Sequence, residues 1–146
     1  MKPYLILAAL LSLLSPVHSE PLLVQPPAAR ASKLSVSDRL LARAFKQQKT
    51  GFMVLFRGTV VANLSDDTVG SRHQRFIVRL KSGQTLLIAH NIDLAPRVEP
   101  LNPADRVTIH GEYVWNSEGG IIHQTHRNPA GSAPGGWIRR SGVTFQ

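Results

Sequence analysis

The sequence predicts a mostly β protein: a small five-stranded OB-like barrel preceded by one N-terminal amphipathic helix. Three observations carry this prediction. Five short segments of strand-like composition follow one another, small turns rich in polar residues and glycine separate them, and one longer interruption falls between the third segment and the fourth. An antiparallel five-stranded barrel of the OB type has this order of short and long connections.

The first 34 residues are not expected to belong to the barrel. Residues 1–19 have Lys2 near the start, a short apolar run and small residues before a cleavage site after Ser19, which is the pattern of a secretory signal peptide. The apolar run is too short for a transmembrane segment. Residues 20–34 are rich in proline and alanine and should form a flexible linker. Residues 35–146 would then be a single domain of an exported protein, periplasmic or extracellular.

The domain is predicted to begin with a helix from Ser35 or Ser37, either of which can cap it, to about Gln48. An apolar stripe should pack on the barrel, while the basic residues face solvent. A basic arm that touches a polyanion or a membrane surface is the alternative role for this helix. The stripe comprises Val36, Leu40, Leu41, Ala44 and Phe45.

Five strands are expected to follow the helix, and the fourth and fifth form a second hairpin after the long interruption. Residues 93–102 fit a short helix or turn with two prolines, and residues 129–136 fit a glycine-rich coil before a short final segment at residues 143–145. The predicted strands are Phe52–Ala62, His73–Lys81, Gln84–His90, Arg106–Trp115 and Gly120–Thr125.

The first hairpin carries the most informative side chains. A two-residue turn at Ser82-Gly83 predicts that Lys81 pairs with Gln84, which sets Arg75 opposite His90. Side chains alternate between the two faces of a strand, so this register sorts them into a buried and an exposed set. The buried set would be Phe76, Val78, Leu80, Leu87 and Ala89. The exposed set would include His73, Arg75, Arg79, Lys81 and His90, and a solvated basic face is the simpler interpretation for Arg79 and Lys81.

The second hairpin is expected to place Glu112 opposite His123, both on the outer face with His110 and Thr125. Glu112 could orient His123 as a general base, although such a pair is more often a surface hydrogen bond. His123 and His126 are three residues apart in a strand, which points them to opposite faces and makes a zinc site at this motif a poor prediction.

The OB topology predicts that polar clusters distant in sequence meet at one rim of the barrel. In that topology the third and fifth strands are parallel neighbours and the second runs antiparallel to the third. The start of the second strand and the ends of the other two would therefore share one rim. This rim would collect Asp66, Asp67, His73, His90, Asn91, Asp93, Thr125, His126 and Asn128.

Composition narrows the partners and the chemistry. The chain has 17 Lys and Arg against 9 Asp and Glu, a formal net charge of +8, which favours a polyanionic partner such as nucleic acid or acidic glycan. It has no cysteine, so disulfides, thiolate catalysis and thiolate metal sites are excluded.

Motifs along most of the mature chain resemble a family of exported proteobacterial proteins of unknown function. The resemblance implies one compact secreted domain and brings no established activity. At Gln124 and at Arg127-Asn128 this chain departs from the family pattern, which has an aromatic residue and His-Asp there. The motifs are Asp66-Asp67-Thr68, His73-Gln74-Arg75-Phe76, His90-Asn91-Ile92-Asp93, Gly111-Glu112-Tyr113, Gly119-Gly120, Thr125-His126 and Gly136-Trp137.

A second resemblance is to staphylococcal-nuclease-like enzymes, which are OB folds. Asp66-Asp67-Thr68 and residues 92–96 are similar in type and order to two segments of those enzymes. The resemblance implies that Asp67 and Asp93 bind calcium and that Arg75 or Arg97 stabilises the phosphate. Arg97 stands about where an acidic residue is expected, and the glycine before the second aspartate of the first segment is replaced.

These observations lead to three function hypotheses. The first is a secreted metal-dependent phosphodiester hydrolase acting on DNA or RNA, in which Asp67 and Asp93 hold one divalent cation (Ca, Mg or Zn). His73 or His90 would activate water, with His123 as a further candidate base, and Arg75 would stabilise the developing charge. Candidate binding residues beside them are Gln74, Asn91, Arg97, Glu112, Thr125 and His126.

The other two hypotheses need no catalysis. One is a binding module for nucleic acid or acidic glycan, in which Arg75, Arg79, Lys81 and the basic helix contact phosphates or carboxylates. The other is a periplasmic metal-binding or envelope-stress protein that uses the histidine and aspartate rim for ligation.

Overall fold

The structure is a computed structural model that describes residues 33–132 and 135–146. The predicted signal peptide, residues 1–19, and nearly all of the predicted linker, residues 20–34, lie outside the described residues. No helix within the described part of the chain has the length and apolar character needed to cross a bilayer.

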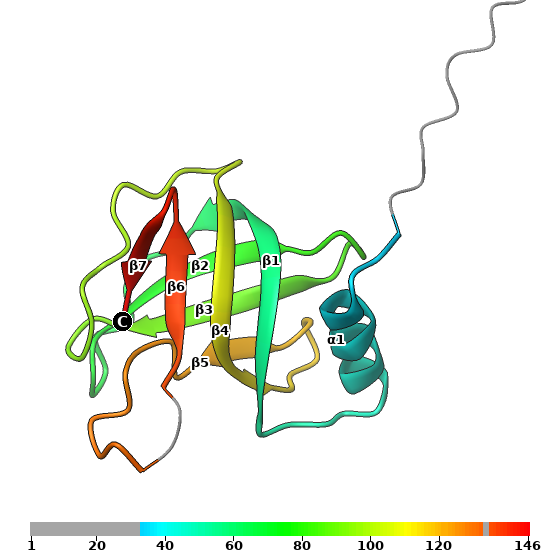
Figure 1. Ribbon diagram of the computed structural model, residues 1–146, viewed down its shortest axis with the longest axis horizontal. Coiled ribbons are helices and arrows are strands. Elements are labelled where there is room, and N and C mark those ends of the chain that lie inside the picture. The colour runs from blue at the N-terminus through cyan, green and yellow to red at the C-terminus, as the bar shows by residue number, and fades with distance from the viewer. Residues whose placement is uncertain (1–32, 133–134) are drawn as a thin grey trace, which may run out of the picture. The chain divides into compact units, whose positions relative to one another are not determined.

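The described chain forms a closed β-barrel with one helix and a two-stranded extension (Figure 1). The barrel closes because β1 pairs with β2 on one edge and with β4 on the other, which completes the ring β1-β2-β3-β5-β4. The elements are α1 (Val36–Lys46), β1 (Phe52–Asn63), β2 (His73–Arg79), β3 (Thr85–Asn91), β4 (Arg106–Val114), β5 (Ile121–His123), β6 (Trp137–Arg140) and β7 (Val143–Phe145).

This architecture confirms the predicted fold class. The parallel pairing of β3 with β5 and the antiparallel pairing of β2 with β3 are both as expected for the OB topology. The sequence did not predict that residues 137–140 extend the sheet: β6 pairs with β4 along the first half of β4, and β7 continues it. β5 is shorter than expected, because Gln124 adopts a positive φ of 52° and ends the strand.

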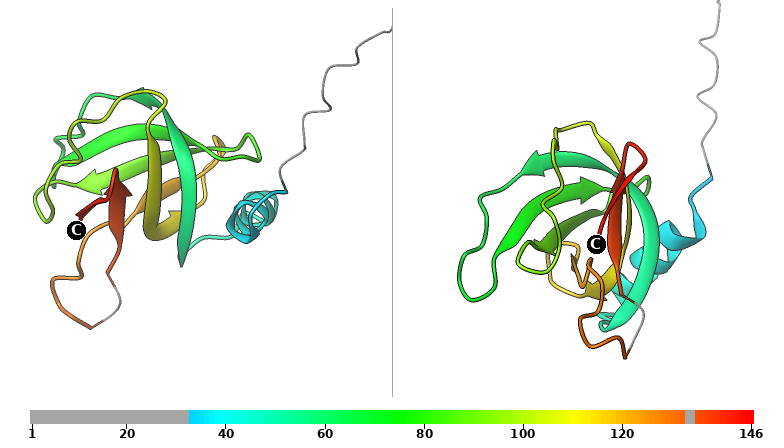
Figure 2. Two further views of the ribbon diagram at one scale, coloured as in Figure 1. Left: turned by 45° about the horizontal axis from the view of Figure 1, so that its top comes forward. Right: turned by 60° about the vertical axis from the view of Figure 1, so that its left-hand side comes forward.

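β1 bends so that one strand serves both sides of the barrel (Figure 2). Its first half pairs with β4 from Phe52 to Thr59, and its second half pairs with β2 from Thr59 onward. The register with β2 shifts between Val60 and Ala62, and such an irregularity increases local bending.

The helix prediction was partly wrong in its buried face. Leu41 and Ala44 are buried against the barrel, but Val36 is 74% exposed and Leu40 is 44% exposed. The helix begins at an N-cap, Ser35, whose backbone and side chain exchange hydrogen bonds with Asp38. Asp38 is therefore buried beside Leu41 and Ala44, although the predicted inner stripe did not include it.

The first hairpin has a different register from the predicted one. The turn contains three residues, Lys81 to Gly83, because the backbone N–H of Leu80 bonds to the carbonyl of Gln84 and β2 pairs with β3 from Arg79↔Thr85 outward. Gln74, not Arg75, therefore lies opposite His90. A one-residue shift moves every side chain of a strand to the other face. The buried residues of β3 are consequently Leu86, Ile88 and His90, whereas Leu87 and Ala89 face outward.

Candidate functional site

His90 lies inside the barrel end rather than on its surface. Its side chain is fully buried, and both ring nitrogens are engaged: Nδ1 with the Thr125 hydroxyl at 2.8 Å and Nε2 with the Pro96 carbonyl at 3.0 Å. A carbonyl can only accept, so Nε2 carries the proton and the Nδ1 of the neutral ring accepts from Thr125. No edge of the imidazole is left for a substrate or water, and this geometry favours a structural role over the predicted catalytic one.

Burial lowers the pKa of His90 below its ordinary value of 6.5, since a charged imidazolium loses its hydration there. The hydrogen bond to Pro96 opposes this effect. The positive charges of His126, His73 and Arg97 add to it when those groups are protonated. His90 is therefore held in its neutral form by the fold.

Two further predicted binding residues also have structural roles. The Gln74 side chain is buried and makes paired hydrogen bonds with the backbone of Val98, at 3.0 Å to its carbonyl and 2.9 Å from its N–H. His126 is buried and bonds through Nδ1 to the Arg127 carbonyl at 2.7 Å. The contacts of Gln74 with Val98 and of His90 with Pro96 fasten the β3–β4 connection to the barrel end, and the contact of His90 with Thr125 fastens the segment after β5.

The polar side chains predicted to meet at this rim therefore do so in part, but much of their contact lies inside the barrel rather than on its surface. The contact of His90 with Thr125 joins the ends of β3 and β5 as the topology required. The shifted hairpin register turns His90 inward. Thr125, expected on the outer face, is also buried, because the positive φ of Gln124 ends β5 and breaks the alternation of faces before Thr125.

The carboxylates predicted to bind a divalent cation accept hydrogen bonds from protein donors. Asp93 accepts hydrogen bonds from the backbone N–H of Arg72 at 2.8 Å and from its Nε at 2.7 Å, and these bonds, the backbone one first, lower the pKa of Asp93. Asp67 accepts from the N–H of Val69. Within residues 33–132 and 135–146, no group of three histidines and carboxylates could hold a metal ion.

Three other predicted residues on this side are held by protein partners. Arg97 forms ion pairs with Asp66 and, at 3.4 Å, with Glu99. Arg75 donates from Nε to the Ser65 carbonyl at 2.9 Å, and Asn91 accepts from the backbone of Asp93. These contacts stabilise the loops around β2 and occupy groups that the hydrolase hypothesis assigned to a phosphate.

A shallow pocket on the outer face does bring three predicted residues together. This histidine pocket, of about 270 Å³, is lined by Asp67, His73, Ala89, Val114, Ile121 and His123. The Nδ1 of His73 donates to the Ser71 carbonyl at 2.8 Å, which leaves the lone pair on Nε2 in the neutral ring. Glu112 lies opposite His123 in the ladder, as predicted, with 3.7 Å between Oε2 and Nε2, and that nitrogen makes no hydrogen bond.

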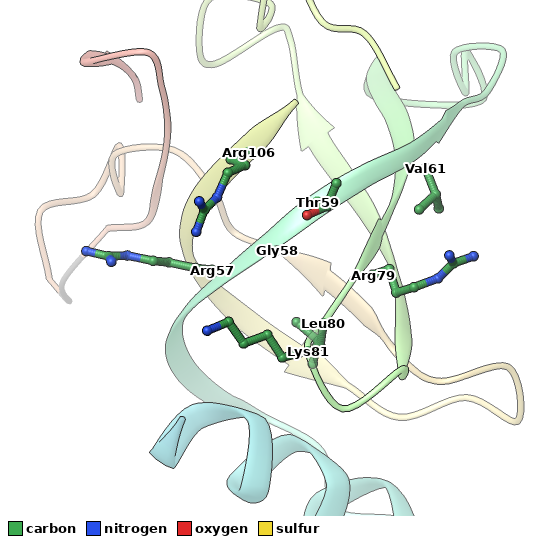
Figure 3. Close-up of a pocket in the computed structure, with 8 residues that line it drawn as sticks. All are labelled: Arg57, Gly58, Thr59, Val61, Arg79, Leu80, Lys81 and Arg106. Carbon is green, nitrogen blue, oxygen red and sulfur yellow. The ribbon is translucent and has the colours of Figure 1, made fainter. Parts of the chain in front are cut away.

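A second hollow of about 320 Å³ lies across β1, between β2 and β4 (Figure 3). We call it the cationic groove, because three arginines and one lysine line it. Thr59 pairs with Arg79 on one neighbouring strand and with Arg106 on the other, so the backbone positions of these residues form one row across three strands, with about 10 Å between the outer two strands. The lining residues are Arg57, Gly58, Thr59, Val61, Arg79, Leu80, Lys81 and Arg106.

The basic side chains of the groove have no counter-charge among the residues that the structure describes. Arg57, Arg79, Lys81 and Arg106 are all exposed, and none of them forms a salt bridge within the described residues. This differs from Arg72, Arg97 and Arg140, each of which pairs with an acid. Like charges gathered without partners repel one another, so the groove is a surface on which a bound anion relieves unfavourable electrostatics.

Two of these four cations were predicted as binding residues, and two were missed. Arg79 and Lys81 come from the first hairpin, whereas Arg57 and Arg106 meet only through the pairing of β1 with β4. The available signal was the outward phase of Arg57 between the buried residues Val54, Phe56 and Val60.

Comparison with known proteins assigns no activity to this arrangement. Residues 23–146 match the model of one protein family, described as "Protein of unknown function (DUF3465)". No curated protein matches the chain.

Proposed function

We propose that this chain, which belongs to the family described as Protein of unknown function (DUF3465), is a non-enzymatic nucleic-acid-binding protein. The sugar–phosphate backbone would lie in the cationic groove. The observation that carries the proposal is the set of four exposed cations that line one hollow with no acidic partner in the described structure. The formal net charge of +8 would favour the approach of a polyanion.

The side chains of the groove suit phosphodiesters in particular. A guanidinium presents a planar fork of donors that matches two phosphate oxygens, and Arg57, Arg79 and Arg106 supply three such forks. Thr59 adds a hydroxyl between two of them. No aromatic residue lines this hollow, so bases have no ring on which to stack. Such a site would contact the sugar–phosphate backbone and would not distinguish one base sequence from another.

If the predicted signal peptide acts as expected, the nucleic acid met by this protein is periplasmic or extracellular. An acidic glycan is the competing ligand, and a sulfated polysaccharide therefore belongs in the binding test.

Replacing Arg57 and Arg106 together by glutamine is expected to weaken binding to duplex DNA by at least about tenfold, because two charge-assisted contacts are lost. The slope of log K against log salt should fall by about 0.9 for each lost phosphate contact. Fluorescence anisotropy with labelled DNA and RNA, over a range of salt concentrations, measures both quantities.

The combined Lys49→Gln and Arg127→Gln variant is the matched control, since it also removes two charges, from exposed residues outside the groove. Equal losses in the control and the groove variants would mean that binding follows net charge alone. Tighter binding to heparin than to any nucleic acid at equal charge would mean that the groove binds acidic glycans instead.

The histidine pocket supports a second candidate function, cleavage of phosphodiesters by acid–base catalysis. Its supporting observation is that His73 and His123, two predicted catalytic residues, line one pocket together with Asp67. The Nε2 of His73 can accept a proton, and the carboxylate of Glu112 lies beside the Nε2 of His123.

If this candidate is right, incubation with RNA or DNA should give cleavage that His123→Gln lowers by about 100-fold or more. The cleavage should persist in chelator, because the described residues offer no metal cluster. His110→Gln is the control, as a half-buried histidine of the same barrel outside the pocket. Activity that His123→Gln leaves intact would place any cleavage elsewhere.

A further inference from the structure

The cationic groove is continuous with a second hollow beside the first residues of α1. This hollow, of about 350 Å³, shares Arg57, Lys81 and Arg106 with the groove. Beyond them it is lined by residues before and within the helix and by the outer face of β1 and β4: Lys33, Ser35, Ser37, Asp38, Leu55, Phe56 and Thr108. A molecule bound along both hollows would run from β2, across β1, to the start of α1.

The second hollow adds positive charge and almost no negative charge. Lys33 is exposed and makes no salt bridge among the described residues. Asp38 is the one acid in the lining, and its side chain is only 2% exposed because its Oδ2 accepts the Ser35 backbone N–H in the capping box. The two hollows together therefore present five exposed cations and one carboxylate that is turned into the protein.

These charges are spread across β1 and towards α1 rather than held at one point. In Figure 3, Arg79 extends to one side of β1, whereas Arg57 extends to the other, and Lys81 lies between β1 and α1. A single phosphate could reach only part of this set. A chain of phosphates, with one charge per nucleotide, could contact the cations in succession.

We infer that the ligand is an extended nucleic-acid strand of several nucleotides, that it spans both hollows, and that the start of α1 is part of its interface. The inference rests on the proposed function and deepens it, since it assigns a polymer rather than a mononucleotide to the site. Lys33 contacts a phosphate beyond the ones held by Arg57 and Arg106. Ser37 and Thr108 offer hydroxyl donors along the path.

The test is a length series of single-stranded DNA, from dinucleotide through hexamer and dodecamer to longer strands, bound to the chain from residue 20 onward. Affinity should rise steeply with length until both hollows are filled. Lys33→Gln should leave the affinity for the dinucleotide unchanged, lower that for the dodecamer about fivefold and reduce its salt slope by about 0.7. An abasic dodecamer should bind as tightly as the normal one.

Arg57→Gln and Arg127→Gln distinguish a failure of this inference from a failure of the proposed function. If Arg57→Gln weakens binding at every length while Lys33→Gln has no effect at any length, the groove binds nucleic acid and the extension to α1 is wrong. A dinucleotide that binds as tightly as the dodecamer would also overturn it. If no strand binds, or if Arg127→Gln weakens binding as much as Arg57→Gln, the proposed function and this inference both fail.

Discussion

His90→Ala is expected to lower the free energy of unfolding by about 3 kcal/mol, one of the largest losses that a single substitution should cause in this protein. The side chain is fully buried, so its removal leaves a cavity in the barrel end. It also leaves the Thr125 hydroxyl and the Pro96 carbonyl without their partner, and unsatisfied buried polar groups cost about 1–3 kcal/mol. Urea denaturation followed by circular dichroism measures the change.

His73→Ala is the matched control, because His73 is only partly buried and lies in the outer pocket. It should cost less than about 1 kcal/mol. A similar loss in both variants would show that the interior contacts of His90 contribute little.

The pH dependence of stability checks the same feature in the unaltered protein. Because the pKa of His90 is lower in the folded state than in the unfolded state, the unfolded chain binds a proton that the folded chain excludes. The contribution is fully present above pH about 6.5 and is lost as the pH falls below that value towards the folded pKa. His90→Gln should remove this part of the pH dependence, and the midpoint of thermal unfolding at each pH would reveal it.

Gly136→Ala is expected to be at least as destabilising, at about 3 kcal/mol or more. A methyl group at Gly136 would overlap the backbone carbonyl oxygens of Gln124 and His110, and backbone atoms cannot move aside as side chains can. The N–H of Gly136 also bonds to the His126 carbonyl at 2.8 Å. The substitution should therefore separate β6 from the segment that follows β5, and the expressed protein should show a lowered midpoint of thermal unfolding.

Gly142→Ala is the comparison that isolates close packing from backbone strain. Gly142 has a φ of +83° but nothing near the position of an added methyl group. Its replacement should lower the free energy of unfolding by about 1 kcal/mol, because a residue with a Cβ atom is strained in the left-handed backbone conformation. A Gly136→Ala variant as stable as Gly142→Ala would mean that the chain around residue 136 relaxes easily.

The fold was predictable because its signals are local. Alternating apolar residues, turn residues and one long interruption were enough for the five-stranded ring and for the pairing of Glu112 with His123. The added hairpin of β6 and β7 was not predictable in the same way. Its strands are short, and the place where they bind is explained only by the first half of β4, which β5 leaves unpaired on one edge.

The candidate site was less predictable, because it depended on single-residue register. A turn of three residues instead of two moved His90 from the surface to the interior and moved Ala89 from the interior to the lining of the histidine pocket. Turn length is decided by packing on both sides of the hairpin, which the turn residues alone do not encode.

The cationic groove was only half predictable, for a different reason. Arg79 and Lys81 belong to one hairpin, but Arg57 and Arg106 become neighbours only when β1 pairs with β4. No local sequence pattern predicts that two arginines distant in the chain will share a face of the sheet. Their missing acidic partners are likewise a property of the folded surface.

The pairing that creates the groove also governs how the chain reaches its native state. Phe52 pairs with Tyr113, so the ring closes only after almost all of the barrel sequence is available. Contacts between such distant segments are slow to form, which places the folding time in the millisecond-to-second range of other β-barrels. Until closure, the edges of β1 and β4 are open to other strands, and aggregation competes with folding.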